Sequence, residues 1–89
     1  MGKELAGTPI DLGDGFYSYS WNLEIGEKET LSCFLSAGNL KVINAGFAPA
    51  RYEPIYAMES FPRRINQWVI SIINESGQRH ITLYLIAKK

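Results

Sequence analysis

Cysteine and histidine are almost absent from this sequence of 89 residues. Cys33 is the only cysteine and His80 is the only histidine. The chain therefore has no intrachain disulfide, no cysteine-based zinc site and no site built from several histidines. A nucleophile–histidine arrangement would have to pass through His80, which starts an alternating strand pattern and is expected to be exposed. Cys33 alternates with Leu31 and Leu35, so we expect it to be a small buried residue.

An excess of charge of either sign is also missing, since nine Lys and Arg balance nine Asp and Glu. Nucleic-acid binding depends on phosphate contacts and normally needs a positive excess, so we expect no nucleic-acid partner. The charge is nevertheless uneven, because residues 1–45 carry a balance of −3 (three Lys, six Asp and Glu) and residues 46–89 carry +3 (six Lys and Arg, three Glu). Either this asymmetry is incidental, or the domain is dipolar and docks head to tail with copies of itself.

Long apolar runs are missing as well. No stretch approaches the roughly 18 apolar residues of a membrane-spanning helix, and the first residues do not resemble a signal peptide. We therefore expect no membrane span, no signal peptide and folding in a reducing cytoplasm. Carboxylates are sparse in the second half, and Gly13-Asp14-Gly15 lacks the lysine and the helix of a phosphate loop. We expect neither enzymatic activity nor a cofactor.

What the sequence does contain is alternation with a period of two residues. From Tyr17 to Ile25, apolar or aromatic residues alternate with polar residues, which is typical of a strand with one solvent-facing side. Further strands are predicted at 30–35, 40–47 and 80–87, and at 68–74, where the apolar run suits a strand covered on both sides. Pro49 and Pro54 bracket an irregular stretch, so residues 52–60 are predicted to form at most a bent or edge strand. Residues 62–64 are predicted to form a loop.

Six predicted strands without helical periodicity indicate an all-β fold. We expect one domain over residues 1–89, a single antiparallel β-sandwich of Greek-key or jelly-roll-like kind with about six to eight strands. Residues 1–12 are expected to be a loose N-terminal arm, followed by a turn at Gly13-Asp14-Gly15. The last two strands are expected to pair as a hairpin around residues 74–78.

Two groups of residues are candidates for binding a ligand or a partner. Tyr17, Tyr19 and Trp21 share one face of their strand, where they form either a stacking platform or part of the core. The second group is basic and aromatic and lies in and near predicted loops, where recognition residues often occur. Its members are Arg51, Tyr52, Tyr56, Arg63 and Arg64. Surface arginines without a partner are also common, and no catalytic or metal-binding residue is predicted.

From Cys33 onward, short elements follow one another in a particular order. A strand with Cys33 leads through Ala37-Gly38 to an apolar strand, Val42 to Gly46, and later to Ser60-Phe61-Pro62. The end of the series is a strand opened by Trp68, the turn Asn74-Glu75-Ser76-Gly77 and the segment Tyr84-Leu85-Ile86-Ala87. In this order the elements resemble a small β-sandwich module of bacteriophage tail and receptor-binding proteins and of bacterial surface proteins. A second cysteine that often closes the family pattern is replaced here by Lys88.

The resemblance implies a non-enzymatic structural or adhesion module, similar to a phage tail or baseplate component, which folds in the host cytoplasm and then joins a virion. Its expected partners are copies of itself, forming a homo-oligomer, or other tail or surface proteins, with a cell-surface glycan as a further partner. The alternative function is a small carbohydrate-binding domain that uses surface aromatics. A strict monomer would argue against assembly, and a fully buried Trp21 would argue against the aromatic platform.

Overall fold

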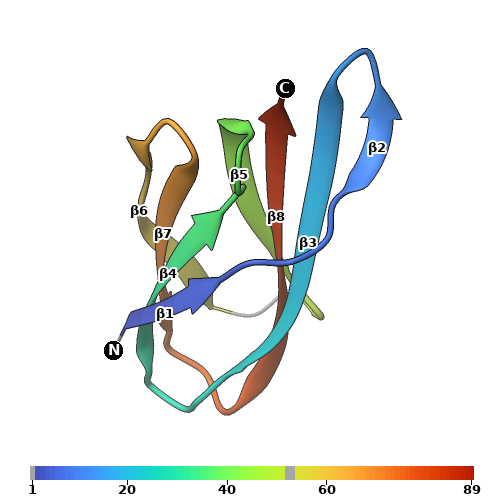
Figure 1. The fold of residues 1–89 in the computed structure, drawn as a ribbon. Coiled ribbons are helices and arrows are strands. Elements are labelled where there is room, and N and C mark those ends of the chain that lie inside the picture. The colour runs from blue at the N-terminus through green and yellow to red at the C-terminus, as the bar shows by residue number, and fades with distance from the viewer. Residues whose placement is uncertain (1, 52–53) are drawn as a thin grey trace.

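The computed structural model describes residues 2–51 and 54–89, and within these ranges the regular structure consists of strands (Figure 1). The eight strands described are β1 (Gly2–Leu5), β2 (Ile10–Gly13), β3 (Phe16–Ile25), β4 (Thr30–Ser36), β5 (Lys41–Pro49), β6 (Ile55–Arg64), β7 (Gln67–Asn74) and β8 (Arg79–Lys88). The all-β fold predicted from the two-residue alternation is confirmed. None of the described residues belongs to a helix that could span a membrane.

The strands form two four-stranded sheets that pack as two layers (Figure 1). Sheet A has the strand order β1-β4-β7-β6, and sheet B has the order β2-β3-β8-β5. Neighbouring strands are antiparallel in every pair except β1 and β4, which are parallel. The expected sandwich is therefore present, with sheets that are mostly antiparallel.

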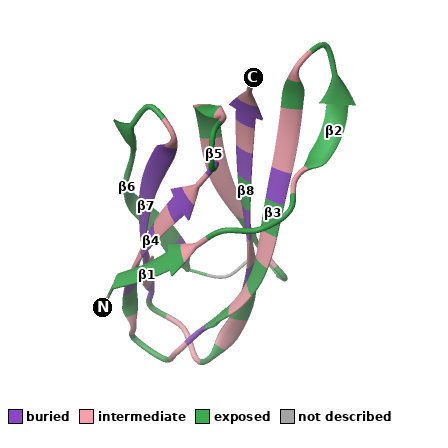
Figure 2. Cartoon of the chain, viewed as in Figure 1, coloured by how far each residue is buried: buried purple, intermediate pink, exposed green. Residues whose placement is uncertain are grey.

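The core lies between the sheets and follows the alternation of the sequence. Leu31, Cys33 and Leu35 of β4 are buried, and so is every second residue of β8 from Ile81 to Ala87. Figure 2 shows buried residues concentrated in β4, β7 and β8, whereas β1, β2 and β6 are mostly exposed. Burying one Leu or Ile side chain contributes about 1.5–3 kcal/mol, so these three strands supply most of the stability.

β7 is buried on both faces, as its continuous apolar sequence predicted. Trp68, Ile70 and Ile72 point into the core, and the alternate residues Val69 and Ser71 on the outer side of sheet A are also buried. Side chains of the flanking strands β4 and β6 lie across that outer side, as the hydrogen bonds to Ser71 show. The outer cover of β7 therefore comes from its own sheet.

Residues 2–5 and 10–13, which were expected to belong to a loose arm, form strands instead. β1 pairs with β4 and closes one edge of sheet A, and its last residue, Leu5, packs against the core. β2 pairs with β3 across the turn predicted from the glycines. Asp14 and Gly15 have φ angles of 55° and 83°, the left-handed pair that a two-residue Asp-Gly hairpin requires. The sequence showed the breaks around these short strands but not the backbone pairing that holds them.

The predicted hairpin around residues 74–78 is wrong, because β7 lies in sheet A and β8 in sheet B. The connection is an arch that crosses from one sheet to the other. The connection from β3 to β4 is a second arch, and the two lie side by side at one end of the sandwich (Figure 1). Asn74 joins them, since its buried amide nitrogen donates to the carbonyl oxygens of Gly26 and Gly77, both at 2.8 Å. A turn pattern in the sequence does not reveal whether the following strand stays in the same sheet.

The prediction of a loop at residues 62–64 is also wrong, because these residues belong to the strand β6. The expected edge strand is confirmed, since β6 pairs only with β7 and forms one edge of sheet A. Its register shifts between Ala57 and Glu59 and again between Pro62 and Arg64. The second shift adjoins Pro62, and prolines and bulges of this kind are usual in edge strands.

Candidate functional site

The aromatic stripe of β3 faces the interior. Tyr19 is 5% exposed, and its hydroxyl donates to the carbonyl oxygen of Ala37 at 3.1 Å. Its ring stacks on the half-buried ring of Trp21 at 5.6 Å between centroids, and burial raises the pKa of the Tyr19 hydroxyl. Tyr17, on the same face of β3, is half-buried. Tyr19 is therefore part of the core and Trp21 packs against it, so Tyr19 has no free face for a ligand.

The basic and aromatic candidates do not form one loop cluster. Tyr56, Arg63 and Arg64 lie on β6, where a rise of about 3.3 Å per residue separates Tyr56 from Arg63 by roughly 23 Å. Arg51 lies in the connection between β5 and β6 and lines a surface hollow with Arg79 and His80. Tyr52 lies outside the described residues. The structure thus gathers Arg63 and Arg64 on one strand and separates them from the remaining candidates.

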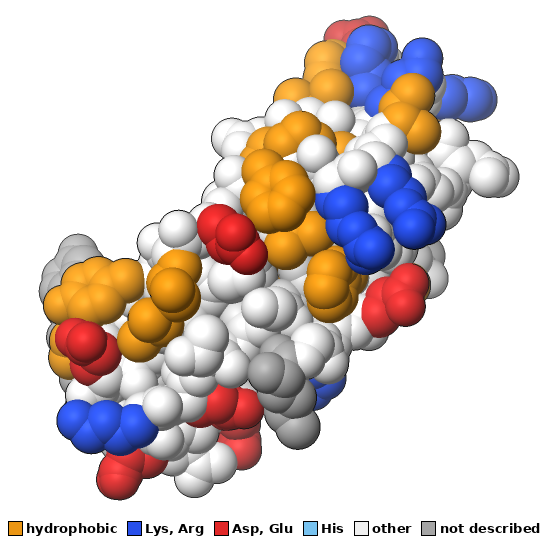
Figure 3. Space-filling model, turned by 90° about the vertical axis from the view of Figure 1, so that its left-hand side faces the viewer, with side chains coloured by type: hydrophobic (Ala, Val, Ile, Leu, Met, Phe, Trp, Pro, Cys, Tyr) orange, Lys and Arg blue, Asp and Glu red, His pale blue; other side chains and the backbone are white. Residues whose placement is uncertain are grey.

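The outer side of sheet A carries an apolar row that runs across the strands. The register aligns Phe61 of β6 with Val69 of β7, and Val69 with Phe34 of β4, while Glu4 of β1 stands at the end of the row. Phe61 is 42% exposed, Phe34 is half-buried and Val69 is buried. Figure 3, which views the molecule from this side, shows hydrophobic side chains in the middle of the face with basic side chains beside them.

An acidic and a basic row flank the apolar row. On one side, Ser71 donates to the Glu59 carboxylate at 3.0 Å and lies 2.9 Å from the Ser32 hydroxyl. Because a hydroxyl has one proton, Ser32 must donate to Ser71 in this chain of bonds. On the other side, the Arg63 guanidinium donates to Gln67 at 3.1 Å and lies over the Phe34 ring at 5.1 Å from its centroid. These contacts hold both charges against sheet A.

We call this surface the sheet-A face and define it by Phe34, Glu59, Phe61 and Arg63. Beside it, β6 and the turn that follows carry most of the remaining exposed apolar side chains of this part of the molecule. Tyr56 is 54% exposed, Met58 61% and Ile65 70%. Aromatic residues, Met and Arg are the types enriched in protein–protein interfaces. The surface thus has the composition of a contact site for protein.

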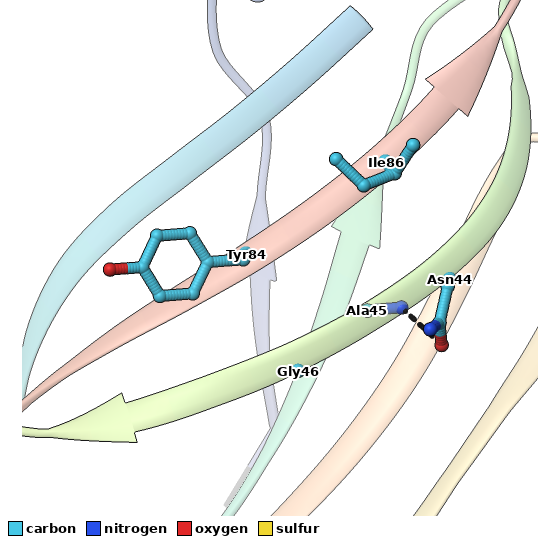
Figure 4. Close-up of a pocket in the computed structure, with 5 residues that line it drawn as sticks. All are labelled: Asn44, Ala45, Gly46, Tyr84 and Ile86. Carbon is cyan, nitrogen blue, oxygen red and sulfur yellow. Dashed lines mark hydrogen bonds between the residues drawn. The ribbon is translucent and has the colours of Figure 1, made fainter. Parts of the chain in front are cut away.

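The outer side of sheet B carries a different surface, centred on Tyr84 of β8. Tyr84 is 44% exposed, and the residues beside it are small, Ser20 on β3 and Gly46 on β5. A shallow hollow of about 170 Å³ opens over Gly46 and is lined by Asn44, Ala45, Gly46, Tyr84 and Ile86. Figure 4 shows the Tyr84 ring extending from β8 on the side away from Asn44, which leaves the space over Gly46 open.

Uncharged polar groups surround Tyr84. The Thr82 hydroxyl donates to the side-chain oxygen of Asn22 at 2.8 Å, and the side-chain oxygen of Asn44 accepts from the Ala45 amide at 2.9 Å. Both asparagines therefore keep their NH₂ groups for other partners, within the part of the chain that the structure describes. We call this surface the Tyr84 face and define it by Ser20, Asn22, Asn44, Gly46, Thr82 and Tyr84.

Neither residue considered for catalysis sits in a reactive arrangement. His80 is exposed, as predicted, and its Nε2 lies 3.6 Å from the Glu24 carboxylate at the surface of sheet B. Cys33 is buried in sheet A, as predicted, and loss of water around the thiol raises its pKa to about 11. A thiol that stays protonated is a poor nucleophile. No cluster of three or more potential metal ligands occurs among the described residues.

The central residues of both faces were not among the sequence candidates. Phe61 and Tyr84 were noted only as parts of the resemblance. For Tyr84 the sequence did contain a signal of exposure. Tyr84 alternates with Leu83 and Leu85 and therefore points to the opposite side of β8. For Phe61 the signal was hidden by Pro62 and by the register shifts of β6.

Comparison with protein-family models identifies a family for this chain. The model described as YjdH matches residues 4–87, nearly the whole sequence, so the chain belongs to the YjdH family. No curated protein and no solved structure gives a significant match. The family name states neither a ligand nor an activity, so the function has to be argued from the two faces.

Proposed function

We propose that this member of the YjdH family is a non-enzymatic structural or adhesion module that assembles with copies of itself, as components of phage tails and baseplates do. The single observation that supports the proposal is the sheet-A face. It combines exposed aromatic side chains with one acidic and one basic residue, all held in place by contacts within the sheet.

The arrangement of charges favours a second copy as the partner. Glu59 and Arg63 lie on opposite sides of the apolar row, two positions away from Phe61 in each direction. A two-fold axis along this row would stack the Phe61 rings of two copies and bring each Glu59 opposite the partner's Arg63. Self-complementarity of this kind is what a two-fold interface requires. Glu4 would lie at the rim, where water screens its charge.

Packing of faces is favoured over addition of strands at the edge. β6 has a free edge, but its register shifts and Pro62 interrupt the row of backbone groups that a new strand would need. Such features are known to block edge-to-edge pairing in natural sheets. The contact would therefore form through side chains of the sheet-A face.

Light scattering with charge reversals tests the proposal. The unaltered protein is expected to form dimers at concentrations up to about 1 mM, where even a weak dimer is populated. Glu59→Arg and Arg63→Glu should each weaken association roughly tenfold or more, because like charges then face each other. The double variant should regain most of it. Lys41→Glu, a reversal on sheet B, is the matched control and should leave association unchanged.

A strict monomer at the highest concentration would refute assembly. Association that survives both single reversals would place the contact elsewhere. The head-to-tail docking suggested by the uneven charge of the sequence predicts open chains of growing size instead of dimers, so the measured mass separates the two arrangements. Thermal unfolding of each variant checks that the fold is retained.

A further inference from the structure

The Tyr84 face carries no charge over the central part of sheet B. Charged side chains occur at its two ends, where Glu24 pairs with His80 and Lys41 pairs with Lys88 in the register. Between these ends, the three strands β3, β8 and β5 present hydroxyl, amide and small side chains around Tyr84. The strand spacing and rise make this area roughly 10 Å across and 13 Å along the strands.

Its chemistry combines one flat apolar surface with directional polar groups. The Tyr84 ring offers an exposed face, and aromatic rings stack on flat ligands with apolar faces. The NH₂ groups of Asn22 and Asn44 have no protein acceptor among the described residues, so they are available as donors. The hollow over Gly46 lies between the ring and Asn44 (Figure 4). A ligand seated there would meet the ring on one side and an amide on the other.

From this geometry we infer that the Tyr84 face binds a neutral carbohydrate. A sugar ring presents C–H groups on its faces and hydroxyl groups around its rim, which match an aromatic surface surrounded by amides and hydroxyls. Stacking removes one face of the Tyr84 ring and one face of the sugar from water, which contributes to the binding free energy. The side-chain amides fix the orientation of the sugar. The inference goes beyond the proposed assembly and uses the opposite sheet.

Other classes of ligand fit this face less well. A nucleic acid or an acidic glycan requires cations near the centre, and the charged residues lie at the ends. An extended peptide gains affinity by pairing its backbone with a free strand edge. β8, which carries Tyr84, is paired on both sides, and the neighbouring edge strand β5 is irregular between Val42 and Asn44, with the Val42 amide already bonded to Ile65. A purely apolar ligand would leave the surrounding amides unpaired.

The test is a glycan array that contains neutral and acidic glycans, followed by titration of the best neutral glycan. Tyr84→Ala should weaken binding roughly tenfold or more, the size expected when a stacking partner is lost. Tyr84→Phe keeps the ring and should stay within about threefold. Tyr56→Ala is the matched control, since Tyr56 is also an exposed tyrosine and lies on the other sheet, at 54% exposed against 44% for Tyr84.

Gly46→Gln provides a second variant that fills the hollow without strain. A Cβ at Gly46 meets no atom within 4 Å, and the residue is not in the left-handed region. The folded variant should lose binding roughly tenfold or more while Tyr84 stays in place. Absence of binding to every neutral glycan, binding to acidic glycans alone, or equal binding by Tyr84→Ala would each overturn the inference. None of these results bears on self-association, which light scattering measures separately.

Discussion

At the scale of single residues, Cys33 shows how burial determines the chemistry of a side chain. The thiol lies in the core between Leu31 and Leu35 on β4 and is fully buried. Loss of water raises its pKa from an ordinary 9.0 to about 11; the nearby Lys3 lowers the pKa, and Glu29 raises it. The protonated thiol therefore behaves as a small apolar residue, which is the role that its position in the alternating pattern predicted.

This shift predicts a loss of stability at alkaline pH. Below about pH 9 the thiol is protonated in both states and the shift has no effect. Between about pH 9 and 11 the unfolded chain releases the proton and the folded chain retains it, so the free energy of unfolding falls by about 1.4 kcal/mol per pH unit from this group. Urea unfolding from pH 8 upward should show a shallower decline for Cys33→Ala than for the unaltered protein.

Burial also raises the pKa of Tyr19, so this residue lowers the free energy of unfolding at alkaline pH as well. It does so in the unaltered protein and in Cys33→Ala alike. The comparison therefore uses the difference between the two pH profiles and not the absolute stabilities, which also differ by the cavity that alanine leaves. Parallel profiles would contradict the assignment of the shift to Cys33.

How far the sequence predicts individual residues depends on the strand in which they lie. In β8 the alternation is regular, and it correctly predicted an exposed His80; the same alternation continues in the structure through the buried residues Leu83 and Leu85. In β3 the pattern gathered Tyr17, Tyr19 and Trp21 on one face but left open whether that face was core or platform. Only the packing of the second sheet showed that Tyr19 lies in the core, with Trp21 packed against it. Sequence alternation defines faces, and tertiary contacts decide which face is buried.

At the scale of elements, the sequence predicted neither the arches nor the two short strands of the N-terminal segment. Alternation and turn residues located the strands β3, β4, β5, β7 and β8, but they led to the prediction that β7 and β8 pair with each other. In the structure β7 pairs with β4, and β8 pairs with β3 and β5. Local sequence records where a strand ends, whereas the choice of its partner depends on residues far away in the chain. The side chain of Asn74 is the local device that makes this crossing stable, since its amide nitrogen also lies 3.4 Å from the Ile25 carbonyl oxygen.

Replacing Asn74 by alanine should therefore be strongly destabilising. The change removes the donor of two half-buried hydrogen bonds, to the carbonyl oxygens of Gly26 and Gly77, and the side-chain oxygen that accepts from the Ser76 amide. The Gly26 oxygen keeps the amide of Glu29 as a donor, and each lost bond costs about 1–3 kcal/mol. We expect a loss of roughly 3 kcal/mol in the free energy of unfolding, measured by urea denaturation. Asn22→Ala, on the exposed side of β3, is the control and should change stability by less than about 0.5 kcal/mol. A similar small effect at both positions would contradict the role of Asn74.

At the scale of the whole molecule, the sheet-A face and the Tyr84 face lie on opposite sides of the sandwich. The first belongs to the outer side of sheet A and the second to the outer side of sheet B. If two copies associate through their sheet-A faces, their Tyr84 faces point away from each other. Such a dimer cannot bind one flat surface with both sites, and gains no avidity there. It is instead suited to connecting two surfaces.

This geometry predicts cross-linking, and the prediction depends on both proposals. Beads coated with a neutral glycan that binds the protein should be agglutinated by the unaltered protein, measured as an increase in turbidity. Arg63→Glu should coat the beads without joining them, since its Tyr84 face is unchanged and its dimer is weakened. Tyr84→Ala should do neither. Agglutination by Arg63→Glu at concentrations where it is monomeric would contradict this arrangement.

The arches also bear on how the chain reaches its fold. Among the strands that the structure describes, only β2 with β3 and β6 with β7 pair as neighbours in sequence. The central strand β8 pairs with β3, from Phe16 against Lys88 to Ile25 against Arg79. Most of the chain has to be synthesised and brought together before this ladder closes, and closing large loops costs entropy before any contact is gained. Domains dominated by such distant pairings fold in milliseconds to seconds. During that interval the apolar strand β7 is exposed, and it would be the segment most open to capture by a chaperone or by another unfolded chain.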